Sequence, residues 1–219
     1  MAIAWNEDDP RDTALLVQNL SQVLRQVAEQ ANLRQPPTVR MAQEWHRRVY
    51  AGARLPVSYY AGEIRDSDPD LPELYGYEVS IGSQRGVESA LVPAELSEFE
   101  AAMHEMVATL DAAIPVGESP ADVAQLRSVL SLCAHAHGEW VRIHPFANGN
   151  GRIARIWSNW CALRYGLPPF VRLKPRPQGT LYATAAALSM RGDHQAMVAV
   201  FAGMLDRHLA PPGDPTATG

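Results

Sequence analysis

The sequence predicts an all-α fold, a helical bundle that carries one small β-hairpin. Apolar residues recur at helical spacing through most of the chain, and only one short stretch shows strand-like alternation. No internal repeat interrupts this pattern. The length of 219 residues suits a single domain with a hydrophobic core.

Two helices are expected in the first fifty residues. The first follows Asp12 or Thr13, since either residue suits an N-cap position. The second begins near Thr38. The apolar positions of the two helices are Leu16, Leu20, Val23, Leu24 and Val27, then Met41, Trp45 and Val49. The first ten residues and the tail "APPGDPTATG" are expected to be frayed ends.

The helical period stops over residues 62–93, which are rich in Gly, Pro and Asp. Within this stretch Tyr77, Val79 and Ile81 alternate with Glu78 and Ser80. Alternation over so few residues is typical of a hairpin rather than of a large sheet. We therefore expect a small β-hairpin, or flap, at this point.

Helical spacing returns over residues 94–114 and continues in three further segments. One helix is expected to start with Ser119 as N-cap, Pro120 in the first position and Asp122 in the first turn, and to end before His144-Pro145. The next helix follows the loop after His144 and stops at Gly166. The last covers residues 180–208, with a break near Gly192-Asp193.

These elements predict three parts: an N-terminal helical extension (1–37), a core domain (38–208) and a disordered tail (209–219). The net charge of -5 provides no basic surface for nucleic acid or anionic membranes, so neither is an expected partner. No signal peptide or membrane span is visible. The two cysteines, Cys133 and Cys161, both fall in expected helices, which favours a reducing, cytoplasmic location, or a secreted effector acting in another cytoplasm.

The stretch "HPFANGNGRIAR", residues 144–155, joins two expected buried helices. Its glycines allow backbone conformations that turn successive N–H groups into one concavity, and the following helix points its positive end there. Arg152 and Arg155 lie three residues apart, so they share a face. A diphosphate or triphosphate suits such a site. His144 is the expected proton acceptor, and Asn148 offers an oxygen to Mg²⁺.

Each part also has a plain structural interpretation. A histidine before proline is often structural, Asn-Gly pairs often form simple turns, and arginines in a first helical turn are often solvated. A zinc site from His135, His137 and His144 is disfavoured, because a spacing of two residues places His135 and His137 on different helix faces. The combination of features in twelve residues favours a nucleotidyl or phosphoryl transferase.

The motif resembles the signature of the Fic (Fic/DOC) family, His-Pro-Phe-x-Asp/Glu-Gly-Asn-Gly-Arg-x-x-Arg. Every specified position matches except Asn148, where the family usually carries an acid. The surrounding stretches "HGEWVRIHPF", "GEIR…YEVSIG" and "LYATAAALSMRGDHQAMVAVF" resemble the helix entering the motif, the flap and the closing helices of that family. The resemblance spans roughly residues 40 to 208. It implies a Fic-type helical bundle with a β-hairpin flap.

The resemblance also implies a function, the transfer of AMP from ATP, with Mg²⁺, to a Ser, Thr or Tyr hydroxyl of a target protein. By position, His144 would be the general base and Asn148 the metal ligand. The implied nucleotide-binding residues are Asn148, Gly149, Asn150, Gly151, Arg152, Arg155 and Tyr182, and the implied flap residues that dock the target as an added strand are Val79, Ser80, Ile81 and Gly82.

Three alternatives stay open. The chain is also compatible with a nucleotide-binding pseudoenzyme or interaction module, and with a Fic enzyme that transfers another phosphate-containing group. Many members carry an inhibitory helix whose glutamate pairs with the second motif arginine, here Arg155. No Glu in this chain is followed by Gly or Asn, as that inhibitory pattern requires. Two outcomes remain: a small inhibitory partner supplies the glutamate in trans, as in a toxin–antitoxin pair, or the enzyme is unrestrained and limited by its weakened metal site. The partner is the favoured expectation.

Overall fold

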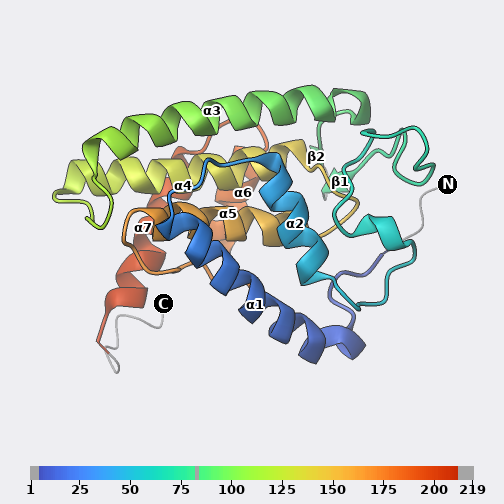
Figure 1. Ribbon diagram of the computed structural model, residues 1–219, viewed down its shortest axis with the longest axis horizontal. Helices are drawn as coiled ribbons and strands as arrows, with labels where there is room; N and C mark the ends of the chain where they lie inside the picture. Colours follow the sequence, from blue (N-terminus) through green and yellow to red (C-terminus); the bar gives the residue numbers. More distant parts are fainter. Residues whose placement is uncertain (1–4, 82–83, 212–219) are drawn as a thin grey trace.

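The structure is a computed structural model that describes residues 5–81 and 84–211. Within these residues it contains seven α-helices and one two-stranded antiparallel hairpin (Figure 1). The helices are α1 (Thr13–Asn32), α2 (Val39–Val49), α3 (Val92–Ala113), α4 (Val123–Ile143), α5 (Asn150–Arg164), α6 (Thr180–Ser189) and α7 (Gln195–Leu209). The strands are β1 (Ser80–Ile81) and β2 (Gln84–Arg85). Three short 3-10 helices, Pro10–Asp12, Ser58–Tyr60 and Ser89–Leu91, complete the elements. The predicted all-α bundle with a hairpin is confirmed.

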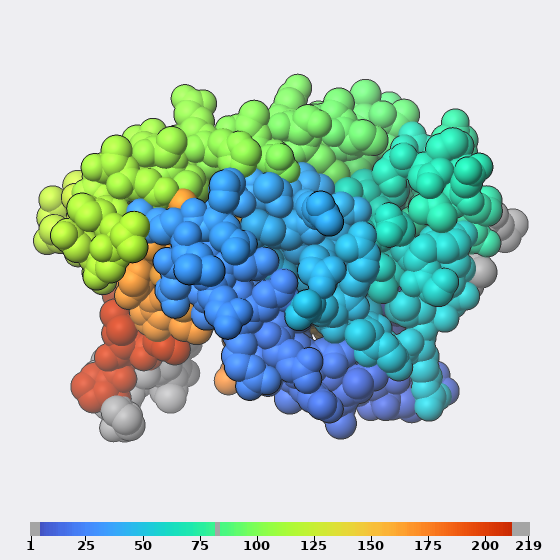
Figure 2. Space-filling model, in the orientation of Figure 1, coloured from blue at the N-terminus to red at the C-terminus, as the bar shows by residue number. Residues whose placement is uncertain are grey.

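Helix α5 lies at the centre of the bundle, between α4 and α1 (Figure 1). Its side chains are buried all round, which is typical of a helix enclosed by other elements. Trp157 packs against Trp45 of α2 at 4.7 Å between ring centroids and against Trp160 at 5.6 Å. Figure 2 shows the N-terminal residues and α2 in blue covering most of α5 from this side. The two motif arginines, which lie on α5, are therefore buried in the core.

The expected helix boundaries hold in most places. Thr38 caps α2, because its Oγ1 accepts from Met41 N at 3.3 Å. Helix α4 ends before His144, as expected from the following proline. The expected break in the last helix is confirmed by a gap between α6 and α7, in which Gly192 has a φ of 82°.

Two expectations about helix ends were wrong. Ser119 does not cap α4. Asp122 does, because it has an extended backbone and its carboxylate accepts from Gln125 N at 2.8 Å. The first ten residues are not frayed over the part that the structure describes. Trp5 packs edge-on against Tyr50, with 4.6 Å between ring centroids, so the chain is anchored before α1 begins.

In the hairpin, Ser80 pairs with Arg85 and Ile81 with Gln84. Gly82, expected in the flap, lies outside the described residues. Among the described helices, none combines the length and the apolar character needed to cross a membrane.

Candidate active site

The loop between α4 and α5 is held by its own side chains. His144 adopts left-handed backbone angles (φ 54°, ψ 56°), and Gly149 has a φ of 79°. Asn150 Nδ2 donates to Phe146 O at 2.8 Å, and Asn150 Oδ1 accepts from Phe146 N at 2.9 Å. Phe146 is fully buried. These bonds fix the turn that directs the chain from His144 into the first turn of α5.

The imidazole of His144 is set up as a base. Its Nδ1 lies 3.1 Å from the carbonyl oxygen of Val141. Since a carbonyl only accepts, Nδ1 carries the proton and Nε2 presents its lone pair. Burial lowers the pKa of His144 from 6.5 to about 4, so the ring is neutral at neutral pH. A neutral ring with a free lone pair can accept a proton from a hydroxyl.

Arg65 connects His144 to the hairpin. Its guanidinium is fully buried and donates to His144 O at 2.9 Å and to Ile143 O at 3.1 Å. The same group donates to Tyr77 O at 2.6 Å and Val87 O at 3.1 Å, on the two sides of the hairpin. Burial lowers the pKa of Arg65 from 12.5 to about 10, which still leaves it charged. Arg65 therefore fixes the flap and the histidine relative to each other.

The hairpin passes directly beside the histidine. A Cβ placed on Gly86 would lie 3.1 Å from His144 Cβ and 2.7 Å from a methyl of Val79. The Val79 side chain is buried, and its carbonyl accepts from Gly86 N at 3.2 Å. Ser80 is exposed. Gly86 thus lies directly beside His144, and Val79 packs against Gly86.

Helix α2 supports the other end of the loop. His46 Nε2 donates to Asn148 O at 3.0 Å, and its Nδ1 accepts from Gly62 N at 2.9 Å. Its ring stacks on Phe146 with 3.9 Å between centroids. Burial lowers the pKa of His46 from 6.5 to about 3, so it is a neutral structural group. A Cβ on Gly149 would lie 2.6 Å from Tyr50 Oη, so this position requires glycine.

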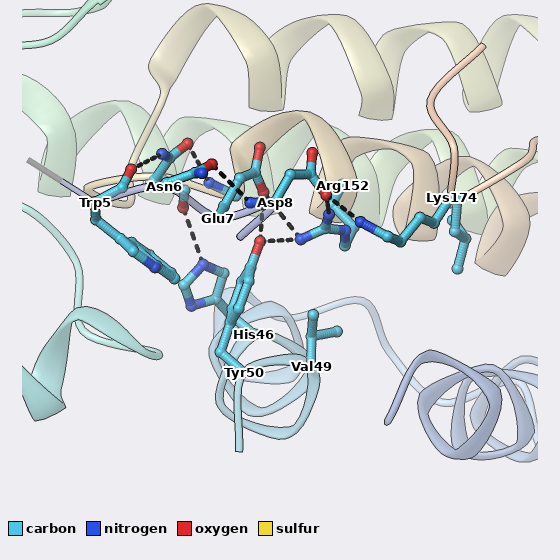
Figure 3. Close-up of polar contacts among 12 residues, drawn as sticks. Trp5, Asn6, Glu7, Asp8, His46, Val49, Tyr50, Arg152 and Lys174 are labelled. Carbon is cyan, nitrogen blue, oxygen red and sulfur yellow. Dashed lines mark hydrogen bonds and ion pairs between the residues drawn. The ribbon is translucent and has the colours of Figure 1, made fainter. Parts of the chain in front are cut away.

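Arg152 is buried, and carboxylates from the N-terminal segment reach it (Figure 3). Its Nη1 lies 3.0 Å from Glu7 Oε2, and its Nη2 lies 2.8 Å from Asp8 Oδ1. Tyr50 hydroxyl accepts from Arg152 and donates to Glu7. Asp8 also pairs with Lys174 Nζ at 2.5 Å. The first motif arginine is therefore already paired with anionic groups of the same chain.

Arg155 lies in the same region without a described carboxylate partner. Its Nη2 donates to Leu173 O at 3.0 Å, and within the described residues its Nε has no hydrogen-bond partner. A cavity of about 430 Å³ opens here, lined by both motif arginines together with Asp8, Lys174 and Arg176. Its walls carry four cationic side chains and one acid, which is the electrostatic character of a phosphate site.

Asn148 and Tyr182 are both engaged with protein atoms. Asn148 Nδ2 donates to Trp5 O at 2.7 Å, and its Oδ1 accepts from Gly149 N at 2.9 Å. Tyr182 hydroxyl lies 2.8 Å from His137 Nε2 on α4. His137 is itself buried. The roles predicted for Asn148 toward metal and nucleotide, and for Tyr182 toward the nucleotide, stay predictions. So do the nucleotide-binding roles of Gly149, Asn150 and Gly151.

The sequence interpretation missed six residues of this site: Glu7, Asp8, His46, Tyr50, Arg65 and Lys174. The acidic run "NEDD" was an available signal, but it falls in a segment expected to fray. The other four lie far from the motif in the sequence and have no spacing that relates them to it. Their proximity depends on how α2, the hairpin and the loop before α6 pack around α5.

Comparison with known proteins bears on this arrangement. The model of the Fic/DOC family matches residues 36–162, which is more than half of the chain. The chain belongs to the Fic/DOC family. A protein named protein adenylyltransferase Fic from Drosophila persimilis is 34% identical over 80 residues, and so is one from Drosophila melanogaster. The match covers 36% of this chain, and 15% and 16% of those two relatives, respectively.

Solved Fic structures share the fold. BepC, a VirB-translocated effector protein of Bartonella tribocorum with bound AMPPNP, superimposes with a TM-score of 0.54 at 15% identity, over 88% of this chain and 86% of BepC. The N-terminal Fic domain of Bep8 from Bartonella sp. 1-1C superimposes with a TM-score of 0.55 at 14% identity, over 92% of this chain and 88% of the Bep8 domain. At this identity the similarity establishes the Fic fold of the chain.

Proposed function

We propose that this Fic/DOC chain transfers AMP from ATP to a Ser, Thr or Tyr hydroxyl of a target protein. The observation that supports this most strongly is that one motif carries a neutral His144, with Nε2 as acceptor, at its first position and two arginines that line a cationic cavity at its end. The names of the Drosophila relatives and the AMPPNP bound to BepC support the donor.

In the proposed reaction, the target hydroxyl oxygen forms a bond to the α-phosphorus of ATP. The bond from that phosphorus to the oxygen bridging to the β-phosphate breaks, and pyrophosphate leaves. The hydroxyl proton passes to His144 Nε2. Arg152 and Arg155 stabilise the phosphate charge together with the N–H groups of Asn150 and Gly151 at the start of α5. The N–H of Arg152 itself donates to Gly149 O at 3.0 Å.

The Mg²⁺ implied by the family has a weakened site in this chain. Asn148 stands where the family carries an acid, and its oxygen already accepts from Gly149 N. Within the described residues no group of three His, Cys, Asp or Glu side chains could hold a metal. Mg²⁺ favours one or two carboxylates together with the phosphates of the substrate. The charge stabilisation proposed for the transfer therefore rests on the arginines and the helix start.

Target docking is proposed for the hairpin beside His144. A two-stranded hairpin can accept an extended peptide as an additional strand. The hydrogen bonds of such a strand recognise the backbone of the peptide more than its side chains. Val79, Ser80 and Ile81 would provide this edge, together with Gly82 outside the described residues. Control by a small inhibitory protein acting in trans also stays a proposal.

Intact-mass spectrometry after incubation with ATP and Mg²⁺ tests the function. We expect the protein, or an added target, to gain the mass of one adenosine monophosphate group. His144→Asn should lower the rate about 100- to 10,000-fold, as expected for loss of a general base. Asparagine is chosen because it tolerates the positive φ of this position better than alanine. Equal mass gain in both proteins would rule out His144 as the base.

The second candidate is a nucleotide-binding protein without transfer activity. The neutral Asn148 favours this candidate, because it lacks the negative charge that the family usually carries at this position. Such a protein would bind ATP and show no mass gain with any target. Wild type and His144→Asn would then be indistinguishable in every assay, whereas the transferase proposal requires them to differ.

A further inference from the structure

The carboxylate of Asp8 bridges two cations that lie far apart in the sequence. Its Oδ1 is 2.8 Å from Arg152 Nη2 and 2.5 Å from Lys174 Nζ. Arg152 belongs to the first turn of α5, whereas Lys174 belongs to the loop before α6 (Figure 3). One anionic oxygen held by a guanidinium and an ammonium group is also the arrangement that a phosphate oxygen adopts in a protein site.

The cavity next to Asp8 carries more positive charge than the carboxylates of Glu7 and Asp8 neutralise. Arg152, Arg155, Lys174 and Arg176 line a space of about 430 Å³, and Asp8 is the acid among its lining residues. Within the described residues, the Nε atoms of both motif arginines are buried and have no hydrogen-bond partner. Buried cationic groups with unused donors favour an anionic ligand of several charges.

Lys174 is directed into the cavity, whereas its neighbour Arg172 is not. The side chain of Lys174 is 18% exposed, and its amine meets Asp8 at the cavity wall. Arg172 is exposed and lines a separate hollow with Phe170 and Met204. The same short loop therefore offers one cation at the site and one away from it.

We propose that Lys174 joins Arg152 in binding a phosphate group of the nucleotide, and that Asp8 occupies the place of that phosphate until the nucleotide displaces it. This rests on the proposed function and deepens it, because Lys174 lies outside the family motif. Glu7 supports the same competition, since it holds the other terminal nitrogen of Arg152 at 3.0 Å.

Competition is favoured over a direct role of these acids in metal binding. The oxygens of Glu7 and Asp8 that face the site already accept from Arg152, Tyr50 or Lys174. A divalent cation beside them would lie next to two positive side chains and be repelled. Although burial would raise the pKa of Asp8, the hydrogen bond from Lys174 and the charge of Arg152 lower it overall, so the acid is ionised at neutral pH.

The test is titration calorimetry of the full chain with ATP and, separately, with inorganic tripolyphosphate, both without metal. Asp8→Asn should lower Kd for both ligands about tenfold, which corresponds to about 1.4 kcal/mol. Its control is Asp9→Asn, which removes the same charge one residue away, from a carboxylate paired with the exposed Arg11. This control should leave Kd unchanged.

Lys174→Ala should raise Kd for both ligands about tenfold, and Arg172→Ala should leave it unchanged. In the Lys174→Ala background, Asp8→Asn should increase ligand affinity less than it does in the wild type. The reason is that Asp8→Asn normally frees both Arg152 and Lys174, and Lys174 is missing there. Lys174→Gln repeats the measurement with a side chain of similar length. Thermal melting of each variant verifies that it is folded.

Several results would overturn the inference. One is Asp8→Asn binding no more tightly than Asp9→Asn, and another is unchanged affinity in both Lys174 variants. Binding that weakens in Asp8→Asn only when Mg²⁺ is present would identify Asp8 as a metal ligand instead. If tripolyphosphate responds as expected but ATP does not bind, the competition stands and the proposed function fails. If neither ligand binds any variant, both proposals fail.

Discussion

The two sides of this site are held together by different kinds of interaction. On the histidine side (His46, Arg65 and His144), the side chains bond to backbone carbonyl and amide groups. On the arginine side (Glu7, Asp8, Arg152 and Lys174), oppositely charged side chains pair with one another. A phosphate could replace the second set, whereas it offers nothing that would replace the first.

This difference separates a preformed part of the site from an exchangeable part. Arg65 binds both the His144 loop and the hairpin, so we expect these two parts to keep their relative position when a ligand binds. Under the proposed competition, the arginines would acquire a new partner when a phosphate arrives and the carboxylates leave. Catalytic geometry would then be independent of ligand binding, and the internal carboxylates would set the affinity. The following experiments test this division, from the largest expected effect to the smallest.

Acid should destabilise the protein through three buried histidines, two of them on the histidine side and the third, His137, elsewhere on α4. Burial lowers the pKa of His46 and His137 from 6.5 to about 3 and that of His144 from 6.5 to about 4. Because the folded pKa lies below the unfolded one, the stabilisation is complete above pH 6.5 and is lost as the pH falls toward about 3 for His46 and His137 and toward about 4 for His144. We expect a loss on the order of 2 kcal/mol for each histidine between pH 7 and pH 5.

Urea unfolding at a series of pH values measures this effect. Carboxylates also titrate in acid, so the informative quantity is the slope of unfolding free energy against pH. The slope is proportional to the number of protons taken up on unfolding, and His137→Gln should reduce that number by about one between pH 6 and 5. His208→Gln, at an exposed site, is the control and should leave it unchanged. Identical slopes in all three proteins would contradict the buried neutral histidines.

Arg65→Met should break the histidine side directly. Four backbone carbonyls lose their buried donor, and methionine fills much of the space without replacing any bond. We expect a loss of about 3 to 5 kcal/mol in unfolding free energy and a strong fall in transfer rate. Arg85→Met on the exposed face of β2 is the control. If both variants unfold at the same urea concentration, Arg65 does not join flap and motif.

Gly149→Ala tests the contact between the loop and α2. The new Cβ would lie 2.8 Å from His46 Nε2, at a φ of 79°. Gly76→Ala is a matched control, since its φ is 65° and no atom lies within 4 Å of the added group. We expect about 1 to 2 kcal/mol from backbone strain in both, and about 1 to 3 kcal/mol more at Gly149 from the clash. Chemical denaturation of the pair separates the two contributions.

Asn148→Asp should have the smallest effect on stability and an informative effect on activity. A carboxylate can bind Mg²⁺ but cannot donate to Trp5 O, so we expect transfer at low Mg²⁺ to be kept or to rise severalfold. Asn148→Ala also loses the hydrogen bond to Trp5 O but adds no metal ligand. It therefore separates the effect of the lost hydrogen bond from the effect of the added carboxylate. Lower activity of Asn148→Asp at every Mg²⁺ concentration would show that the site does not use a metal there.

Local sequence signals predicted the bundle and the motif loop well. Proline at 145 ended α4 as expected, and the glycines and Asn150 turned the chain into α5. Ser119 was mistaken for a cap because sequence alone cannot show which of two neighbouring polar residues adopts an extended backbone. The partners of Arg152 could not be predicted, because Glu7 and Asp8 reach it through packing over more than a hundred residues. Lys174 in turn reaches Asp8 from a loop whose path depends on the fold.

The hydrogen bond from Asn148 to the carbonyl of Trp5 has an evolutionary consequence. An amide can donate this bond and a carboxylate cannot, so the residue that removes a charged metal ligand also secures the segment that carries Glu7 and Asp8. The two characters should be inherited together. Relatives with Asn at this position are expected to keep an acidic pair shortly before α1, and relatives that regained the acid are expected to have lost it.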